Sequence, residues 1–198
     1  MENNVAILVL AAGESKRLGK IKQLLKYRGK SLLESIVEKA LLANPEVVVV
    51  LGAHYEQVHQ AIKHYPVMVV ENKHWKEGVA SSIRCGLQTV TVKNPNIKGV
   101  IILLSDQPLV TSDHILSITR QASDENNKII ATAYREVIGV PAYIPKTYFE
   151  TLETLRGNTG AKKLINENRD EVRIINLEDA GIDIDTPRDW NEFISREG

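Results

Sequence analysis

Short runs of apolar, mostly β-branched residues alternate with amphipathic segments along the whole chain. Continuous apolar runs of this length are typical of strands buried on both faces of a sheet. We therefore predict strands at 5–10, 47–51, 67–70, 99–104, 129–134, 142–144 and 172–175. Apolar positions at helical spacing predict helices at 31–43, 55–63, 79–90, 112–123, 146–154 and 160–166, and a last helix that begins at residue 187.

This alternation predicts both the fold class and the place of the site. It is typical of an α/β fold, here a three-layer α/β/α Rossmann-like sandwich with a mostly parallel mixed sheet. Residues 1–198 contain no segment of linker composition, so we expect a single domain. In such sheets ligands bind at the carboxyl ends of the strands. Functional residues are therefore expected directly after the predicted strands.

Composition and charge narrow the class of protein. The chain has 25 basic and 25 acidic residues and a formal net charge of zero, which argues against a general nucleic-acid-binding protein. No apolar run approaches the roughly 20 residues of a membrane span. Glu2, rather than a basic segment, precedes the first apolar run, which argues against a signal peptide. We expect a cytoplasmic protein without nucleic-acid or membrane partners.

The cysteine and the histidines carry little chemistry. A single cysteine, Cys85, excludes an intramolecular disulfide and a multi-cysteine metal site, and we interpret it as a half-buried thiol rather than a nucleophile. The histidines show no metal-ligand spacing. We interpret all of them as surface or capping groups: His54, His59, His64, His74 and His114.

The loop after the first predicted strand comes close to two phosphate-binding motifs and fits neither. Residues 10–25 read LAAGESKRLGKIKQLL. A P-loop has four residues between its glycines, whereas five separate Gly13 from Gly19. A dinucleotide-binding loop has glycines where this chain has Ser15 and Leu18. These departures disfavour a Walker-type ATPase and a hydride-transfer enzyme.

The same loop still has the parts of an anion-binding cradle. Its small residues allow backbone N–H groups to approach a ligand closely. Ser15 can donate a hydrogen bond, Arg17 carries a forked permanent cation, and Lys22 carries a mobile one. Seven basic residues and no acid lie between residues 16 and 30. We interpret the stretch as a triphosphate-binding loop, with a solvated basic surface loop as the alternative.

This loop also carries a resemblance to a known family. Its pattern Leu-Ala-Ala-Gly-x-Ser-x-Arg-Leu-Gly-x-x-Lys resembles the signature of the MobA-like nucleotidyltransferases, with Leu18 in place of the usual Met. Ala12 makes it similar to the molybdenum cofactor cytidylyltransferase branch, because the related guanylyltransferases carry Gly there. The resemblance implies a fold of the nucleotide-diphospho-sugar transferase type. It also implies a nucleotide-binding half at about 1–110 and an acceptor-binding half at about 111–198.

Two acidic segments are candidates for a metal site. Asp106 follows the strand predicted at 99–104, where a carboxylate is well placed to hold a hard cation, although it could instead cap the next turn. Asp185 precedes a predicted helix start with Thr186 at the N-cap, where Asp189 reads as a structural partner of the cap. Asp183 is an alternative ligand or a support for Asp185. The resemblance implies that Asp106 and Asp185 bind Mg²⁺.

Further segments of the chain match the family pattern and suggest where the substrates bind. The resemblance implies nucleotide recognition around Gly78 and Ser82, for which helix capping is the structural alternative. In the second half it implies acceptor binding around Pro141, Asn158 and Gly160. The chain has Asn158 and Lys162 where the family usually carries Asp and Arg, which affects the acceptor's identity more than the reaction type.

The sequence as a whole therefore predicts a Mg²⁺-dependent transfer of a nucleoside monophosphate to a phosphomonoester. The resemblance implies that the donor is CTP, that the acceptor is molybdopterin, and that a molybdoenzyme is a further partner. Arg17, Lys22 and Asp106 are the predicted catalytic residues. Alternatives are the use of GTP, a sugar-phosphate acceptor, or a non-catalytic protein that binds and delivers a cofactor. The predicted nucleotide-binding residues are Leu10, Ala11, Ala12, Gly13, Ser15, Arg17, Lys22, Gly78, Ser82 and Asp106.

Overall fold

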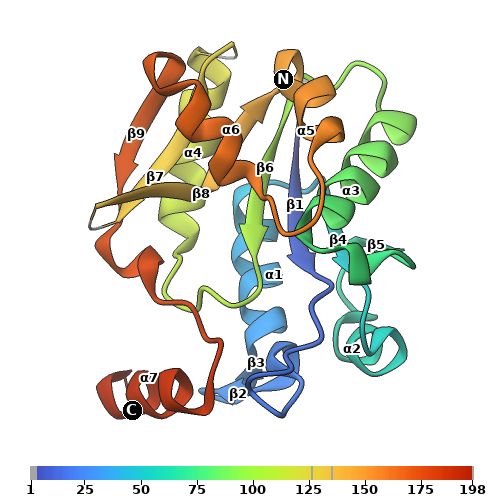
Figure 1. The fold of residues 1–198 in the computed structure, drawn as a ribbon, viewed down its shortest axis with the longest axis vertical. Helices are drawn as coiled ribbons and strands as arrows, with labels where there is room; N and C mark the ends of the chain where they lie inside the picture. The colour runs from blue at the N-terminus through green and yellow to red at the C-terminus, as the bar shows by residue number, and fades with distance from the viewer. Residues whose placement is uncertain (1–3, 126, 135, 198) are drawn as a thin grey trace.

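A computed structural model describes residues 4–125, 127–134 and 136–197. Its centre is a seven-stranded sheet in the order β5-β4-β1-β6-β8-β7-β9. In this sheet β8 runs opposite to the other six strands, since its pairings with β6 and β7 are antiparallel and the rest are parallel (Figure 1). The strands are β1 (Val5–Ala11), β4 (Val47–Leu51), β5 (Met68–Glu71), β6 (Gly99–Leu104), β7 (Ile129–Tyr134), β8 (Val137–Pro145) and β9 (Val172–Asn176).

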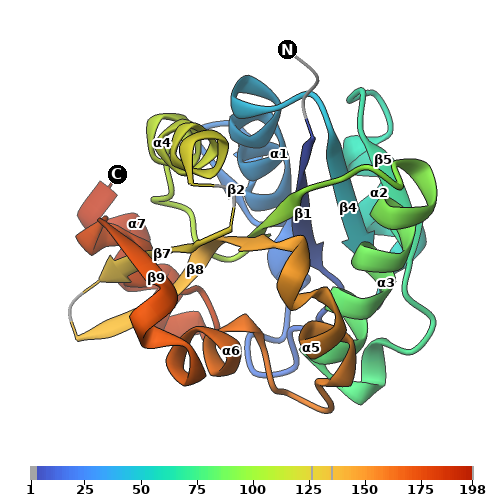
Figure 2. The same cartoon turned by 90° about the horizontal axis from the view of Figure 1, so that it is seen from above.

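Helices cover both faces of the sheet, which confirms the predicted three-layer α/β/α fold (Figure 2). One face packs against α1 (Leu32–Ala43), α2 (Tyr55–Ile62) and α4 (Ser112–Asp124). The other face packs against α3 (Val79–Lys93), α5 (Phe149–Thr154) and α6 (Ala161–Glu167). Every residue of β1 and β4 is buried, as expected for strands that are covered on both faces.

The C-terminal helix α7 (Pro187–Glu197) packs away from the main sheet. Its Phe193 joins a small apolar cluster with Leu32 and Ile184. The start of the helix has the predicted cap, since the Thr186 Oγ accepts from the Asp189 N–H and the Asp189 carboxylate accepts from the Thr186 N–H. This packing fixes the segment that carries Asp183 and Asp185 against the end of the sheet.

The structure contains a short hairpin beyond the predicted elements, and it places one histidine in the core rather than at the surface. A short hairpin, β2 (Lys26–Tyr27) and β3 (Lys30–Ser31), was not predicted because each strand is only two residues long. The prediction of five surface or capping histidines is wrong for His114. That side chain is buried, and its Nε2 lies 2.7 Å from the Thr132 Oγ1. Burial lowers the pKa of His114, so it packs as a neutral polar group inside the core.

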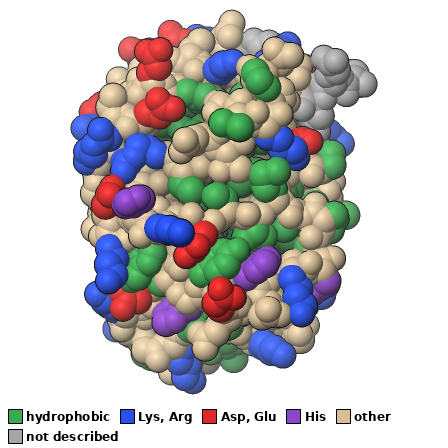
Figure 3. Space-filling view, turned by 90° about the vertical axis from the view of Figure 1, so that its right-hand side faces the viewer, with side chains coloured by type: hydrophobic (Ala, Val, Ile, Leu, Met, Phe, Trp, Pro, Cys, Tyr) green, Lys and Arg blue, Asp and Glu red, His purple; other side chains and the backbone are tan. Residues whose placement is uncertain are grey.

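Charge is distributed differently on the outside of the molecule and at the ends of the strands. On the face shown in Figure 3, acidic and basic side chains are interspersed and form no large region of one sign. Within the described residues, no helix has the length and apolar character needed to cross a membrane. The concentration of charge that matters for chemistry lies instead in a cleft at the carboxyl ends of β1 and β6.

Candidate active site

A cleft of about 710 Å³ opens where the loops after β1 and β6 meet. All ten predicted nucleotide-binding residues line it, together with Asp185, Asp183 and Asn158. The cleft thus brings together residues from positions 10 to 185 of the chain. Its place at the carboxyl ends of parallel strands is where this fold class binds ligands.

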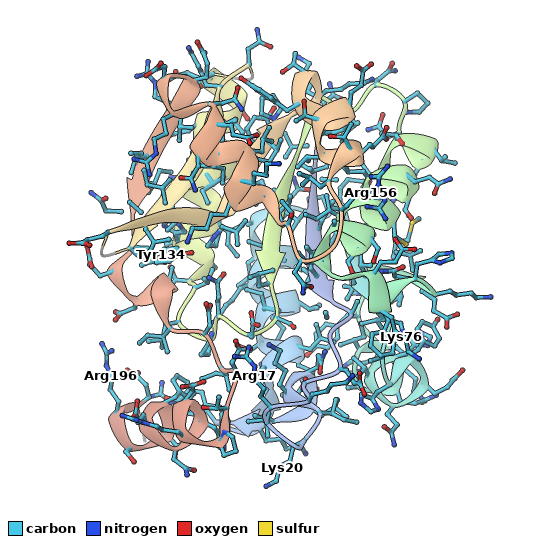
Figure 4. The ribbon with its side chains drawn as sticks, viewed as in Figure 1. Arg17, Lys20, Lys76, Tyr134, Arg156 and Arg196 are labelled. Atoms are coloured by element: carbon cyan, nitrogen blue, oxygen red, sulfur yellow. The ribbon has the colours of Figure 1, made fainter. Side chains whose placement is uncertain are left out.

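Two cations and two carboxylates form an ion-pair cluster in this cleft. The Lys22 Nζ lies 2.5 Å from the Asp106 Oδ2 and 3.0 Å from the Asp185 Oδ1. An Arg17 guanidinium nitrogen lies 2.6 Å from the Asp185 Oδ2. Figure 4 shows Arg17 reaching from the loop after β1 toward the segment that precedes α7, while Lys20 points away from it. The predicted phosphate-binding cations and metal-binding carboxylates are therefore in direct contact.

Burial within the cluster sets the protonation of its members. Desolvation opposes the charge of Lys22, but the hydrogen-bonded carboxylates of Asp106 and Asp185 outweigh it and raise the pKa of the ammonium. Desolvation by the cleft floor, followed by the charges of Asp106 and Asp185, raises the pKa of Asp183 to about 6. The Asp183 carboxyl group therefore begins to gain a proton as the pH falls toward 6.

A buried glutamine, which the sequence analysis did not single out, holds the loop after β1 in place. The Gln23 Nε2 donates to the Ala11 carbonyl at 3.0 Å and to the Gly13 carbonyl at 2.9 Å. Its Oε1 accepts from the Ser15 hydroxyl, and the Ser15 Oγ also accepts from the Lys22 backbone N–H. An isolated buried polar residue has no periodic signal in a sequence, so only the loop's need for hydrogen-bond partners could have indicated it.

Gly78 and Ser82 are held by structural contacts at the cleft wall. Gly78 has a φ of +103°, and the loop at Gly157 packs so closely on it that no side chain would fit. The Ser82 hydroxyl accepts a 3.0 Å hydrogen bond from the Asn72 side-chain amide. Both residues line the cleft, so these contacts fix this part of its wall.

A smaller, more apolar cavity of about 260 Å³ adjoins the cleft. Asn158 and Asp183 line both spaces, and Gly160 lines the smaller one. Of the three predicted acceptor-binding residues, Pro141 is not brought into either space. It is buried, and its carbonyl accepts from the Thr132 hydroxyl. Its neighbour Val140 lines the smaller cavity instead.

The carboxylate pair fits a divalent cation whose other ligands would come from a substrate. Among the described residues, no group of three or more His, Cys, Asp and Glu side chains is arranged to hold a metal. The Asp106 Oδ1, however, is buried and has no hydrogen-bond partner in the described part of the chain. Mg²⁺ is commonly bound by one or two carboxylates together with substrate phosphates. Asp106 and Asp185 meet that requirement.

The fold and site together define a class: an α/β protein with a basic loop after its first strand and a carboxylate pair at its strand ends. A family model described as the MobA-like NTP transferase domain matches residues 7–172. The chain belongs to this family, which confirms the resemblance found in the first loop.

Similar proteins have several names. The chain is 29% identical over 192 residues to a nicotine blue oxidoreductase of Paenarthrobacter nicotinovorans, covering 90% of this chain and 91% of that protein. It is 22% identical over 185 residues to the molybdenum cofactor cytidylyltransferase of Escherichia coli, covering 92% of each. The crystal structure of Rv0371c from Mycobacterium tuberculosis is similar with a TM-score of 0.81 and 30% identity, over 96% of this chain and 97% of that one. A complex of Rv0371c with manganese is similar with a TM-score of 0.77 and 27% identity, over 96% of this chain and 97% of that one.

Proposed function

We propose that this chain transfers CMP from CTP to a phosphorylated small molecule and releases pyrophosphate, with Mg²⁺ as its cofactor. The proposed acceptor is molybdopterin carrying molybdenum, and the product would pass to a molybdoenzyme in the cytoplasm. The observation that carries the proposal is the contact between two cations and two carboxylates at the strand ends: Arg17, Lys22, Asp106 and Asp185. The similarity to the cytidylyltransferase of E. coli supports the choice of acceptor.

The reaction requires positioning and charge neutralisation rather than a strong base. An oxygen of the acceptor's phosphate attacks the α-phosphorus of CTP, and the bond from that phosphorus to the oxygen bridging to the β-phosphate breaks. A phosphate oxygen is already nucleophilic at neutral pH, so no proton has to be removed. Arg17 and Lys22 neutralise the charge that gathers on the departing pyrophosphate.

Asp106 and Asp185 are the residues that would hold the divalent cation. When bound, the cation polarises the α-phosphate and offsets the charge that develops there. The unpartnered Asp106 Oδ1 supports this role, because a buried carboxylate oxygen without a partner is costly unless a ligand satisfies it. The manganese complex of Rv0371c supports a divalent cation in proteins of this shape.

Ala12 supports CTP over GTP. Its methyl group packs at the cleft wall, where a Cβ placed on Gly52 would lie 2.9 Å from the Ala12 Cβ and 2.6 Å from the Trp75 Cβ. The wall is therefore packed tightly where Ala12, Gly52 and Trp75 meet, and the methyl group has no room to move toward Gly52. A glycine at this position would leave more room for a purine base.

The smaller cavity is the proposed acceptor site, with Asn158 and Gly160 at its wall. It adjoins the cleft at Asp183 and Asn158, so an acceptor bound there would lie beside the nucleotide's phosphates. Holding the acceptor and the nucleotide side by side would raise the rate of transfer, because the reacting groups are already close and correctly oriented.

The test is pyrophosphate release measured with each of the four nucleoside triphosphates, Mg²⁺ and a set of phosphorylated acceptors that includes molybdopterin and sugar phosphates. We expect release with CTP and molybdopterin. Release with GTP or a sugar phosphate would replace the proposed substrates while keeping the reaction type. CTP binding without release in the presence of molybdopterin would favour a protein that only binds and delivers a cofactor.

A further inference from the structure

The position of Lys22 is fixed by the surrounding backbone. Lys22 begins the short 3-10 helix Lys22–Leu24, and its backbone N–H donates to the Ser15 hydroxyl. The next residue, Gln23, is buried and bonded to the loop carbonyls. The Lys22 side chain is only 13% exposed, and that of Asp106 is 17% exposed. The ammonium group is therefore directed between the two carboxylates by the fold itself.

The ammonium lies between the two carboxylates that would hold a divalent cation, and only the Asp106 Oδ1 of the pair is left without a hydrogen-bond partner in the described part of the chain. The ammonium bonds one oxygen of Asp106 and one oxygen of Asp185, and Arg17 bonds the other oxygen of Asp185. Two carboxylates held this close repel each other unless a cation lies between them. Lys22 and a divalent cation are therefore alternative partners for the same pair of side chains.

The two cations of the cluster differ in how a ligand can reach them. The Arg17 side chain is 71% exposed, whereas that of Lys22 is mostly buried. A single phosphate can bind Arg17 at the surface and leave Lys22 in place. A chain of phosphates has enough charged oxygens to bind both cations at once and to draw Lys22 away from the carboxylates.

We propose that Lys22, assisted by Arg17, keeps the metal-binding carboxylates closed in an ion-pair cluster, and that a polyphosphate opens the site by drawing both cations onto its own oxygens. The divalent cation then enters only together with a polyphosphate-bearing ligand. This inference rests on the proposed function insofar as the cleft receives a triphosphate. It adds the order in which polyphosphate and divalent cation bind. It also specifies that a polyphosphate, rather than a monophosphate, opens the site.

A lysine that only bound phosphate could be removed without strengthening the binding of a free divalent cation, whereas removal of Lys22 should strengthen it. Removing the Lys22 charge leaves two carboxylates without their internal counter-ion, so the variant attracts a free divalent cation more strongly than the native protein does. Binding of polyphosphate and of metal is coupled, and the coupling acts equally in both directions because linkage is reciprocal.

The experiment measures Mn²⁺ binding to the full chain without any nucleotide, by the electron paramagnetic resonance signal of the free ion. The variants are Lys22→Met, Arg17→Met and the control Lys20→Met, which removes the same charge from the same basic stretch at a side chain that points away from the cluster. We expect Lys22→Met to bind Mn²⁺ at least about tenfold more tightly than the native chain, within the range of typical coupling energies. Arg17→Met should show a smaller gain, and Lys20→Met should match the native chain.

A second arm uses inorganic tripolyphosphate, which has the phosphate chain of CTP without a base. In equilibrium dialysis with equal tripolyphosphate on both sides, the native chain should retain more Mn²⁺ than it does with inorganic phosphate. Lys22→Met should show a smaller increase. Thermal melting of each variant checks that it is folded, and Arg17→Met carries the test if Lys22→Met does not fold.

The inference is overturned if native chain and Lys22→Met bind free Mn²⁺ within twofold of each other, if the variant binds it more weakly, or if tripolyphosphate leaves Mn²⁺ retention unchanged. No acceptor or nucleotide is present in these measurements, so they are independent of the transfer assay. Transfer without this linkage would remove only the present inference, and linkage without transfer would remove only the proposed reaction.

Discussion

The cleft and the smaller cavity beside it share a few wall residues, including Asn158 and Asp183, but the rest of each wall is made of different kinds of residue. The cleft is lined mainly by loops, and its charged side chains contact one another across distant segments. The smaller cavity is lined largely by aliphatic residues of strands and helices, such as Ile83, Ile102 and Val140. The difference indicates a division of work. Under the proposed function, the cleft would bind the charged phosphates and the cavity would select the acceptor by shape and apolar contact. Substitutions in the two regions should therefore affect different kinetic constants.

The largest effect on the reaction rate is expected from substitution of a carboxylate in the cleft. Asp106→Ala removes one proposed metal ligand and leaves Lys22 with a single acidic partner. Loss of a charge-stabilising ligand in phosphoryl transfer should reduce the rate of pyrophosphate release by on the order of 10³-fold. Asp113→Asn, on the exposed start of α4, is the matched control. Turnover of Asp106→Ala within a few-fold of native would contradict the assignment.

Filling the smaller cavity should weaken binding of the acceptor, which is a change in KM, whereas the loss of Asp106 should lower the rate. A Cβ added at Gly160 would meet the Val79 side chain at an ordinary 3.6 Å, so a larger side chain can be accommodated and would extend at the cavity wall. Gly160→Leu should raise KM for the acceptor by roughly tenfold or more while KM for CTP changes less than about twofold, because only uniform acceptor binding is lost. Thr159→Leu adds similar bulk at a position that lines neither space. Equal changes in both KM values would remove the division between the regions.

A smaller effect, on the preference between CTP and GTP, is expected from a substitution at the cleft wall. Ala12→Gly removes the methyl group that packs near Gly52 and should improve the use of GTP relative to CTP by about tenfold, since one methyl group in a pocket is worth roughly 1–3 kcal/mol of discrimination. The measurement is kcat/KM for both nucleotides with the same acceptor. An unchanged ratio would show that the base is read elsewhere in the cleft.

The smallest effect concerns Asp183, which lies where the two regions meet. Its pKa is raised to about 6 in the folded protein, above the ordinary value of an aspartate, so the folded state binds a proton that the unfolded state has lost. The stability contribution of this proton is therefore lost as the pH rises from about 4 to about 7. Melting temperatures should fall more over this interval for the native chain than for Asp183→Asn. Parallel curves for the two proteins would contradict this prediction.

The sequence predicted the framework better than the contacts inside the site. Buried strands such as residues 47–51 have a strong local signal, because a strand covered on both faces is apolar throughout. The first loop was also recognisable, since small and basic residues follow a strand directly. The contact of Lys22 with Asp106 and Asp185 depends on segments 84 and 163 residues away along the chain, so no local pattern encodes it.

Residues that act through buried hydrogen bonds were the hardest to anticipate. Gln23 organises the loop although glutamine usually lies at the surface, and His114 pairs with Thr132 inside the core although histidine is only intermediate in burial. Pro141 shows the reverse case. The family pattern placed it at the acceptor, but the fold buries it and exposes the neighbouring Val140 to the cavity. Such one-residue differences follow from which face a strand residue occupies.

The most direct test of the proposed function follows the α-phosphate of CTP. The native chain is incubated with CTP labelled at the α-phosphorus, Mg²⁺ and molybdopterin, and the labelled product and pyrophosphate are quantified together. The account predicts that the label moves to the acceptor and that one pyrophosphate is released for each CTP consumed. Label recovered as free CMP, or unreacted CTP beside bound acceptor, would contradict it.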